Sequence, residues 1–351
     1  MHKFIVTFRC YLLIGFCGLF CAACHSEKRE VFPAFYHWQT ELDLSDFEKN
    51  YLQKTGVQKI YVKFFDVDKE GEEIIPKALI YGDSLAYFLR DKTIVPTIFI
   101  TNRTLKNISE AEISDLAQKM VAKITYLATS HQLLFSELQL DCDWTLTTKD
   151  AYFTLIHQIR QLLPATVKIS ATIRLHQIKF YDKTGVPPVD RGMLMYYNMG
   201  DLEDKATANS IIDNTIGSQY LQNARHYPLE LDMALPIFAW GVLFRDGRMI
   251  RLINDLRGAD LADTSRFEKS DPTHFAIKQS SYLKSYYLYA GDEIRLEKSD
   301  FKDLEEAAAI LSPLVNTDQM NLVFYHLDST NLATFSPDYL KKIVRIFENE
   351  K

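Results

Sequence analysis

Eight short runs of apolar, β-branched and aromatic residues recur along the chain, and helix-like amphipathic stretches separate most of them. In order they are AFYHW (34–38), KIYVKFF (59–65), IVPTIFI (94–100), ELQLDCD (137–143), KISATIR (168–174), MLMYYN (193–198), ELDMALP (230–236) and NLVFYH (321–326). Strands that alternate with helices are typical of a parallel sheet, and eight parallel strands close into a barrel. The sequence therefore predicts an α/β fold, a (β/α)8 TIM-like barrel.

Amphipathic stretches predict the helices that connect these strands. The clearest cover residues 44–55, 109–129, 148–162 and 300–314, and the first can begin after either of two capping residues, Asp43 or Ser45. The alternative to a barrel is an open, doubly wound sheet, which binds a nucleotide at a glycine-rich turn after its first strand. HWQT (37–40) stands at that place and contains no glycine, which disfavours the alternative.

One connection is far longer than the others. About 84 residues, 237–320, separate the seventh run from the eighth, and a connection of that length must hold structure of its own. FRDGRMIRL (244–252) has strand-like flanks around Asp246-Gly247 and predicts a hairpin. Residues 281–297 predict further extended chain with a turn at Gly291-Asp292. We expect a small α+β insertion between strands 7 and 8, at the carboxyl mouth of the barrel.

The first 23 residues have the make-up of an export signal. Lys3 and Arg9 accompany an uncharged run, CYLLIGFCGLFCAA (10–23), which is shorter than the roughly 20 apolar residues of a membrane-spanning helix. Small residues directly before Cys24 resemble a lipobox, in which that cysteine is acylated and becomes the mature N-terminus, although Cys21 stands where leucine is usual. An ordinary secretory signal or an uncleaved anchor is the alternative.

This reading predicts three segments: a lipoprotein signal peptide at 1–23, a tether at 24–30 and the barrel at 31–351. Without residues 1–23 the chain has 38 basic and 46 acidic residues, a net charge of −8, which makes nucleic acid a poor partner. Only Cys142 remains in the folded part, so neither an intrachain disulfide nor a cysteine-based zinc site is possible there. We expect a protein attached to the bacterial cell envelope by lipid, with no cofactor and no metal.

Polar and apolar residues alternate along the fourth run. Leu138 and Leu140 share one face of this strand, while Gln139, Asp141 and Asp143 share the other. Because the apolar face meets the helices, the two aspartates are predicted inside the barrel and at its mouth, about 6.6 Å apart along the backbone. Neighbouring carboxyls raise one another's pKa, which suits a general acid. A purely structural pair is the alternative for Asp141 and Asp143.

Further charged residues share this inner side. The fifth run places Arg174, and then His176, beside the carboxyls of the fourth. Arg174 can bind substrate or only form an internal salt bridge, and a lone histidine is a weak signal. In the second run the same alternation points Lys63 inward and leaves Asp66 or Asp68 at the mouth.

Aromatic residues crowd the predicted mouth. Rings of this kind suit the apolar faces of sugars, although most aromatics in any barrel pack its core. The candidates are Tyr36, Trp38, Trp144, Tyr197, Phe238, Trp240 and Tyr325.

Five short motifs, in this order along the chain, resemble the chitinase-like barrels of glycoside hydrolase family 18. The family's first strand ends with a tyrosine and a tryptophan, as in FYHW (35–38), and its second strand is aromatic-rich, as in IYVKFF (60–65). DCDWT (141–145) matches the fourth-strand motif D-x-D-x-E at both aspartates. MYYN (195–198) matches M-x-Y-D with Asn198 for the aspartate, and ALPIFAWG (234–241) is similar to G-x-P-x-Y-G. The resemblance covers residues 31–330.

The resemblance implies a carbohydrate ligand, an acetamido-sugar polymer in most of the family, and an insertion after the seventh strand. In the family the glutamate of D-x-D-x-E protonates the leaving oxygen, and the preceding aspartate orients the acetamido group that attacks the anomeric carbon. Here Thr145 stands at the glutamate position, and a threonine is no acid at neutral pH. The third-strand motif S-x-G-G is also replaced, by IFITNRT (98–104).

Three functions remain open at this point. The first is a divergent hydrolase in which Asp141 or Asp143 supplies the acid and Tyr197, Asn198 and Trp240 position the sugar. The second is a non-catalytic glycan-binding protein that uses the same mouth. The third is a lipid-anchored component whose insertion meets a protein partner.

Overall fold

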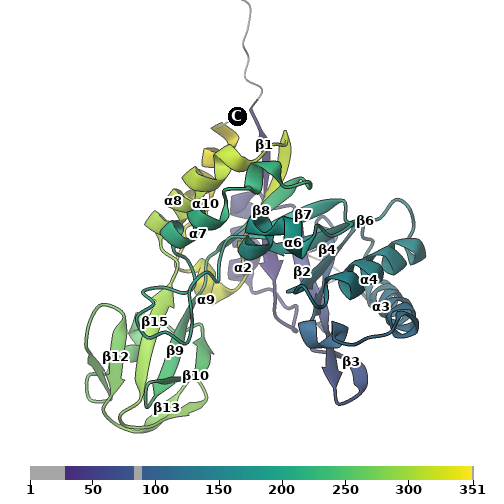
Figure 1. Ribbon diagram of the computed structural model, residues 1–351. Helices are drawn as coiled ribbons and strands as arrows, with labels where there is room; N and C mark the ends of the chain where they lie inside the picture. The colour runs from purple at the N-terminus through teal and green to yellow at the C-terminus, as the bar shows by residue number, and fades with distance from the viewer. Residues whose placement is uncertain (1–27, 83–88, 350–351) are drawn as a thin grey trace, which may run out of the picture.

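The computed structural model describes residues 28–82 and 89–349, and eight parallel strands close a barrel in it (Figure 1). The predicted signal peptide and Cys24 lie outside these residues. Around the barrel the strands follow the order β1-β2-β4-β5-β6-β7-β8-β16, and β16 pairs with β1 to close it. Their bounds are β1 Glu30–His37, β2 Lys59–Glu70, β4 Thr93–Ile100, β5 Glu137–Cys142, β6 Lys168–Arg174, β7 Arg191–Met195, β8 Leu231–Pro236 and β16 Gln319–Tyr325. All eight predicted strands are confirmed.

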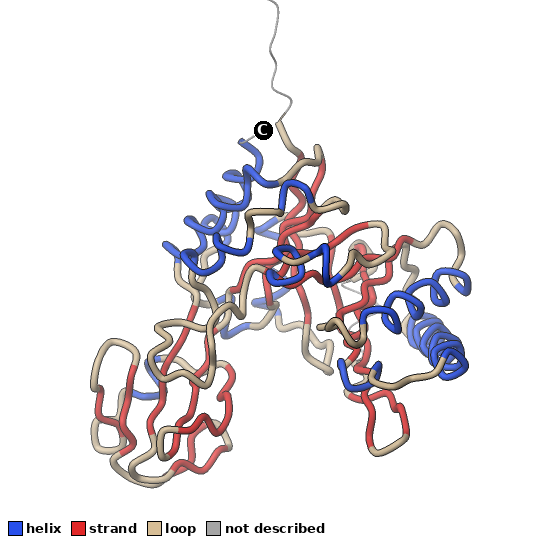
Figure 2. The backbone as a smooth tube through the Cα atoms, in the orientation of Figure 1, coloured by secondary structure: helices blue, strands red, loops and turns tan. Residues whose placement is uncertain are grey.

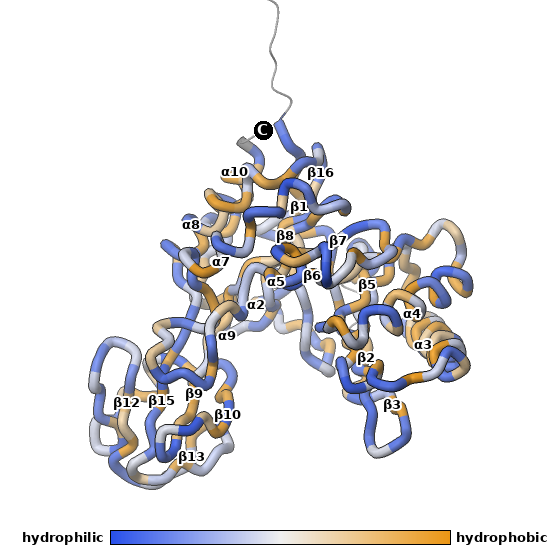
Figure 3. The backbone as a smooth tube through the Cα atoms, viewed as in Figure 1, coloured by the Kyte–Doolittle hydropathy of each residue, from blue (hydrophilic) through white to orange (hydrophobic). Residues whose placement is uncertain are grey.

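Helices cover the outside of the barrel, and their polar and apolar residues alternate as amphipathic helices require (Figure 3). The longer ones are α2 Asp46–Thr55, α3 Glu110–Ser130, α4 Lys149–Leu162, α8 Phe301–Leu311 and α10 Pro337–Asn349. Shorter ones are α5 Leu175–Lys179, α6 Tyr181–Thr184, α7 Asn214–Tyr220 and α9 Ser329–Leu332. The 3-10 turns of the described chain are η2 Asn102–Leu105, η3 Ala224–His226, η4 Gly258–Leu261 and η5 Ser312–Leu314. Ser45, rather than Asp43, caps α2 in a capping box with Glu48.

The long connection folds as a second sheet that projects from the barrel (Figures 1 and 2). Its five strands are β9 Ala239–Arg245, β10 Arg248–Asn254, β11 Phe267–Lys269, β12 His274–Ile277 and β15 Glu293–Lys298, and β13 Ser281–Leu283 and β14 Tyr286–Leu288 form a hairpin beside it. The predicted turn at Asp246-Gly247 joins β9 to β10, with φ of 51° and 74°. The projecting sheet at 239–298 holds one helical element, η4, and α8 and η5 follow it before β16. The connection between β8 and β16 therefore contains both strands and helices.

The insertion has its own apolar core, which includes Leu243, Ile253 and Phe267. After β15 the chain returns to the barrel, where α8 packs against α7 and α10. A β-hairpin that the sequence did not reveal, β3 Glu73–Lys77, extends β2 at the mouth.

Hydrogen bonds confirm the predicted facing of the strands. Inside the barrel the Tyr36 hydroxyl donates to Gln139 Oε1 at 2.6 Å, and the Thr172 hydroxyl donates to Asp141 at 2.6 Å. Leu138 and Leu140 lie on the other face of β5 and are fully buried. Apolar residues therefore join strands to helices, while polar pairs fill the barrel axis.

The first described residues are part of the fold at the amino end of the barrel. Arg29 is buried there, and its guanidinium donates to the carbonyl oxygens of Phe347 at 2.7 Å and Val315 at 2.9 Å. Figure 1 shows this end of the molecule opposite the projecting insertion. Among the described residues no helix is both long and apolar enough to cross a membrane.

Candidate functional site

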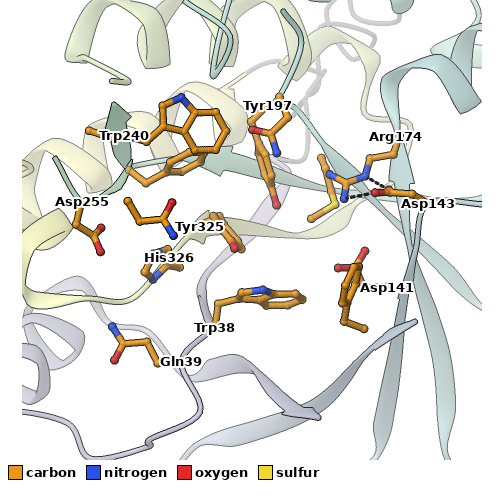
Figure 4. A pocket seen from close by; sticks show the side chains of 16 residues that line it. Trp38, Gln39, Asp141, Asp143, Arg174, Tyr197, Trp240, Asp255, Tyr325 and His326 are labelled. Carbon is orange, nitrogen blue, oxygen red and sulfur yellow. Dashed lines mark hydrogen bonds and ion pairs between the residues drawn. The ribbon is translucent and has the colours of Figure 1, made fainter. Parts of the chain in front are cut away.

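A pocket of about 400 Å³ opens at the carboxyl ends of the barrel strands, where the insertion meets the barrel (Figure 4). Its position is the place where barrels of this type carry their active sites. The residues that line it are Trp38, Gln39, Phe99, Asp141, Asp143, Arg174, Met195, Tyr197, Asn198, Phe238, Ala239, Trp240, Asn254, Asp255, Tyr325 and His326.

Aromatic rings form one wall of the pocket. Tyr197 stacks on Tyr325 with ring centroids 5.3 Å apart, and Trp38 lies 5.7 Å from Tyr325. Phe238 and Trp240 extend the wall from the insertion side, 5.2 Å apart. The Tyr197 hydroxyl is buried and has no hydrogen-bond partner among the residues described. An apolar wall with an unused hydroxyl suits a sugar ring, which presents both C–H faces and hydroxyl groups.

Asp141 lies at the bottom of the pocket, where it is only 2% exposed. Burial raises the pKa of its carboxyl to about 6, the nearby Arg174 lowers it and Asp143 raises it. Its carboxyl accepts a hydrogen bond from the Thr172 hydroxyl. A carboxyl of this kind can carry a proton near neutral pH, as a general acid must.

Asp143, the next inward residue of the same motif, forms an ion pair, whereas Asp141 accepts a hydrogen bond from a hydroxyl. Arg174 donates to both of its oxygens, through Nε to Oδ1 and through Nη2 to Oδ2 at 3.2 Å (Figure 4). Protonation of Asp143 would remove the negative charge that holds both guanidinium nitrogens. Because of this pair, Asp143 is better placed to accept hydrogen bonds than to deliver a proton.

A second arginine–carboxylate pair supports the insertion side of the pocket. The indole Nε1 of Trp240 donates to Glu297 at 2.7 Å, and Arg295 Nε donates to the other oxygen of Glu297 at 2.5 Å. Ser210 donates to Glu297 as well, through both its amide and its hydroxyl. Arg295 and Glu297 have no exposed side-chain surface. The buried pair fixes the direction of the Trp240 ring.

The structure brings eight of the eleven predicted catalytic and substrate-binding residues to this pocket. They are Trp38, Asp141, Asp143, Arg174, Tyr197, Asn198, Trp240 and Tyr325.

The other three lie elsewhere. Tyr36 is fully buried beneath Trp38, with the two rings at 85°. The Trp144 ring is buried away from the pocket: it stacks on Tyr152 at 5.2 Å, and its Nε1 donates to the Thr184 carbonyl at 2.9 Å. His176 lines a neighbouring hollow of about 470 Å³, which shares Asp143, Arg174, Tyr197 and Asn198 with the pocket and also borders Thr145.

The inward lysine of β2 pairs within the barrel wall. Lys63 binds Asp66 at 3.2 Å, and its Nζ lies 5.8 Å from the Trp38 ring. Asp68 is held by Lys77 at 3.0 Å and by Arg103, so it anchors the β2–β3 hairpin. Neither aspartate lines the pocket.

Sequence reasoning missed seven lining residues: Gln39, Phe99, Met195, Ala239, Asn254, Asp255 and His326. His326 stands directly after the end of β16 and Gln39 two residues after the end of β1, positions that could have revealed them. Asn254 and Asp255 come from the insertion, and no local pattern indicates which of its residues reach the barrel.

No known family profile and no curated protein matches the chain by sequence. Solved structures do match it over most of its length. The spore cortex-lytic enzyme SleL of Bacillus cereus has a TM-score of 0.57 at 14% identity, covering 92% of this chain and 76% of SleL. The family 18 chitinase ChiB of Flavobacterium johnsoniae has a TM-score of 0.51 at 12% identity, covering 92% of this chain and 94% of ChiB. This barrel has the fold of the family 18 chitinases.

A third neighbour of the chitinase-like barrel was solved with a sugar. Catalytic domain 2 of the Ostrinia furnacalis Group II chitinase, in complex with an N-acetylchito-oligosaccharide, has a TM-score of 0.53 at 11% identity, covering 92% of this chain and 97% of that domain. Identities this low establish a distant likeness of fold. In the described part of the chitinase-like barrel no three histidine, cysteine or acidic side chains come close enough together to hold a metal ion.

Proposed function

We propose that this protein is an exported lipoprotein of the cell envelope that binds a carbohydrate in the mouth of its chitinase-like barrel without cleaving it. The observation that carries the proposal is the pairing of Asp143 with Arg174, beside a threonine at the position of the family's acid. The pocket keeps an aromatic wall and hydrogen-bonding groups, which binding requires. It offers no free carboxyl at the place where the family's chemistry needs one.

The envelope part of the proposal rests on the sequence of residues 1–24, and the described chain begins at the end of the barrel opposite the pocket. Cys24 lies four residues before the first described residue, Lys28, and the chain enters the barrel at its amino end. The eight residues of β1 separate that end from the pocket by about 26 Å, at 3.3 Å per residue. A lipid on Cys24 would therefore leave the pocket turned away from the membrane.

Asp141 supports a second candidate, a divergent hydrolase. Its carboxyl lines the pocket and its pKa is raised to about 6, mainly by burial. Such a group could protonate a leaving oxygen if the ligand sits low enough in the pocket.

The test is a calorimetric titration of the purified protein with N-acetylglucosamine oligomers and with peptidoglycan fragments, followed by chromatography of the same samples after long incubation. We expect saturable binding and unchanged ligand. Trp38→Ala should weaken binding about tenfold or more, since burial of a large apolar side chain against the ligand is worth about 1.5–3 kcal/mol. Tyr126→Ala, which removes a ring 65% exposed on α3, is the matched control and should change nothing.

Each alternative gives a different result. Products that appear with the wild type and vanish with Asp141→Asn would establish the hydrolase. A folded protein that binds none of the sugars would reject both carbohydrate functions and leave a protein partner for the insertion, whose Tyr282 and Tyr289 are 70% and 51% exposed.

A further inference from the structure

The carboxyl of Asp255 reaches the pocket from the insertion and is not used by the fold. Asp255 directly follows β10 and lines the pocket across from Asp141 and Asp143 (Figure 4). Within the described chain no hydrogen bond or ion pair reaches its side chain, and its backbone amide donates to the Ala239 carbonyl at 3.0 Å. Asp255 is half-buried and its carboxylate faces the pocket, so both oxygens are free to accept hydrogen bonds from a ligand.

A role as a mere turn residue does not account for Asp255. Its φ is 55°, in the left-handed region that aspartate tolerates better than most residues. Asp246 has the same kind of backbone, with φ of 51°, but it lies exposed at the tip of the β9–β10 hairpin. Left-handed backbone therefore explains why an aspartate is allowed at position 255, but not why its carboxyl faces the pocket.

The groups around Asp255 leave its charge uncompensated. Asp328 is a second carboxylate nearby, occupied by Gln39 and by the amides that begin α9. Arg257 donates to Asn331 and is not within ion-pair distance of either acid in the described chain. Burial, together with Asp328, raises the pKa of Asp255, while His326, Arg257 and Lys284 lower it. Lys284 pairs with Asp260 at 3.4 Å, and no described cation lies within ion-pair distance of Asp255.

The two histidines of this corner do not supply that partner. Burial lowers the pKa of His37 to about 4 and also lowers the pKa of His326, so both imidazoles are neutral at neutral pH. The Nδ1 atoms of both rings are buried and have no hydrogen-bond partner among the described residues. Across the whole pocket, three carboxyls face one guanidinium, that of Arg174, which already binds Asp143.

We infer that the Asp255 corner of the pocket binds an ammonium group of the glycan, so that the protein selects saccharides with a free amino sugar over fully N-acetylated or acidic ones. This inference rests on the proposed carbohydrate function and names the ligand class. An ammonium can donate a charge-assisted hydrogen bond to Asp255. A ligand carboxylate would meet excess negative charge and be repelled.

The experiment compares three oligosaccharides of equal length by calorimetry at neutral pH: a glucosamine oligomer, an N-acetylglucosamine oligomer and a uronic acid oligomer. Wild-type protein should bind the glucosamine oligomer about tenfold or more tightly than the acetylated one, the range for a charge-assisted bond, and the uronic acid oligomer weakest. Asp255→Asn should abolish this preference and leave affinity for the acetylated oligomer within about twofold. Asn tolerates the same backbone, so the variant should fold.

Asp246→Asn is the matched control, since it removes an equal charge from the same insertion at the same backbone conformation outside the pocket. It should keep the preference. Higher salt should weaken the preference of the wild type without changing its affinity for the acetylated oligomer. Equal affinities of the wild type for the amino and acetylated oligomers, or a preference that survives Asp255→Asn, would overturn the inference while leaving carbohydrate binding intact. Binding to none of the three would reject the proposed function itself.

Discussion

Two arginine–carboxylate pairs flank the pocket, and they differ in burial rather than in chemistry. Arg174 and Asp143 sit at the carboxyl ends of β6 and β5, with Asp143 half exposed at 50%, while Arg295 and Glu297 in β15 are wholly buried. The open pair can exchange its partners for water or a ligand. The buried pair cannot, because taking either charge away leaves the other without solvent. The Asp143–Arg174 pair can therefore bind a ligand, and the Arg295–Glu297 pair holds the Trp240 ring in the pocket wall.

The largest expected effect comes from the buried pair. Glu297→Gln leaves Arg295 charged, buried and without its counter-ion, which should cost about 3–5 kcal/mol of unfolding free energy. Urea denaturation measures it. Glu293→Gln on the same strand is the matched control: Glu293 pairs with Lys205 at 2.8 Å but is 43% exposed, so its loss should cost less than about 1 kcal/mol. Similar losses for the two variants would remove the distinction between buried and open pairs.

Asp141 lies beside the Asp143–Arg174 pair, and its carboxyl should make the free energy of unfolding fall as the pH rises. Its pKa in the folded state is about 6 against an ordinary 3.8, so the folded state binds its proton more tightly than the unfolded chain does. This contribution is complete below pH about 4 and is lost as the pH rises to about 6. Asp141→Asn should remove the dependence and stabilise the protein at neutral pH by about 1–3 kcal/mol. Thermal unfolding across pH 4–8 measures it, and an unchanged profile would contradict the burial of that charge.

The link from the buried pair to the pocket is the indole N–H of Trp240. Trp240→Phe keeps a ring but removes the bond to Glu297, which should cost about 1 kcal/mol of stability and weaken sugar binding. Trp144→Phe removes a similar buried N–H bond, to Thr184, at a site away from the pocket. It should cost comparable stability and leave sugar affinity unchanged, as urea denaturation and calorimetry on both variants will show.

The smallest effect is expected at the open pair. Asp143→Asn should change the unfolding free energy by less than about 1 kcal/mol, because both partners reach solvent and the amide can still accept one bond from Arg174. Denaturation of this variant beside Glu297→Gln completes the comparison. A loss as large as that of Glu297→Gln would mean that Asp143 is structural.

Local patterns determined most of the fold in advance. Alternation placed all eight barrel strands and the inward face of β5, and the Asp-Gly turn placed the β9–β10 hairpin. These features depend on neighbours in sequence, so a single chain shows them. The same reasoning placed Trp144 at the mouth, but β5 ends at Cys142. Beyond a strand end the backbone turns and alternation no longer gives the direction of a side chain.

The part of the site that sequence could not show comes from the insertion. Asp255 reaches the pocket only because β10 folds back against β9 and ends beside the barrel, a consequence of tertiary packing. Its carboxyl has no motif around it, and its neighbours Asp328 and His326 lie about 70 residues further along the chain. Trp240 was predicted from its place after the seventh strand, whereas its partner Glu297 lies 57 residues away.

The central claim, a pocket that binds sugar without cleaving it, is tested most directly by a crystal structure of the protein soaked with a chito-oligosaccharide. The account predicts an intact oligosaccharide with one ring against Trp38 and Tyr325, and the Asp143–Arg174 pair still formed. A cleaved ligand with Asp141 at the broken bond would contradict the claim. So would a ligand that binds elsewhere and leaves the pocket empty.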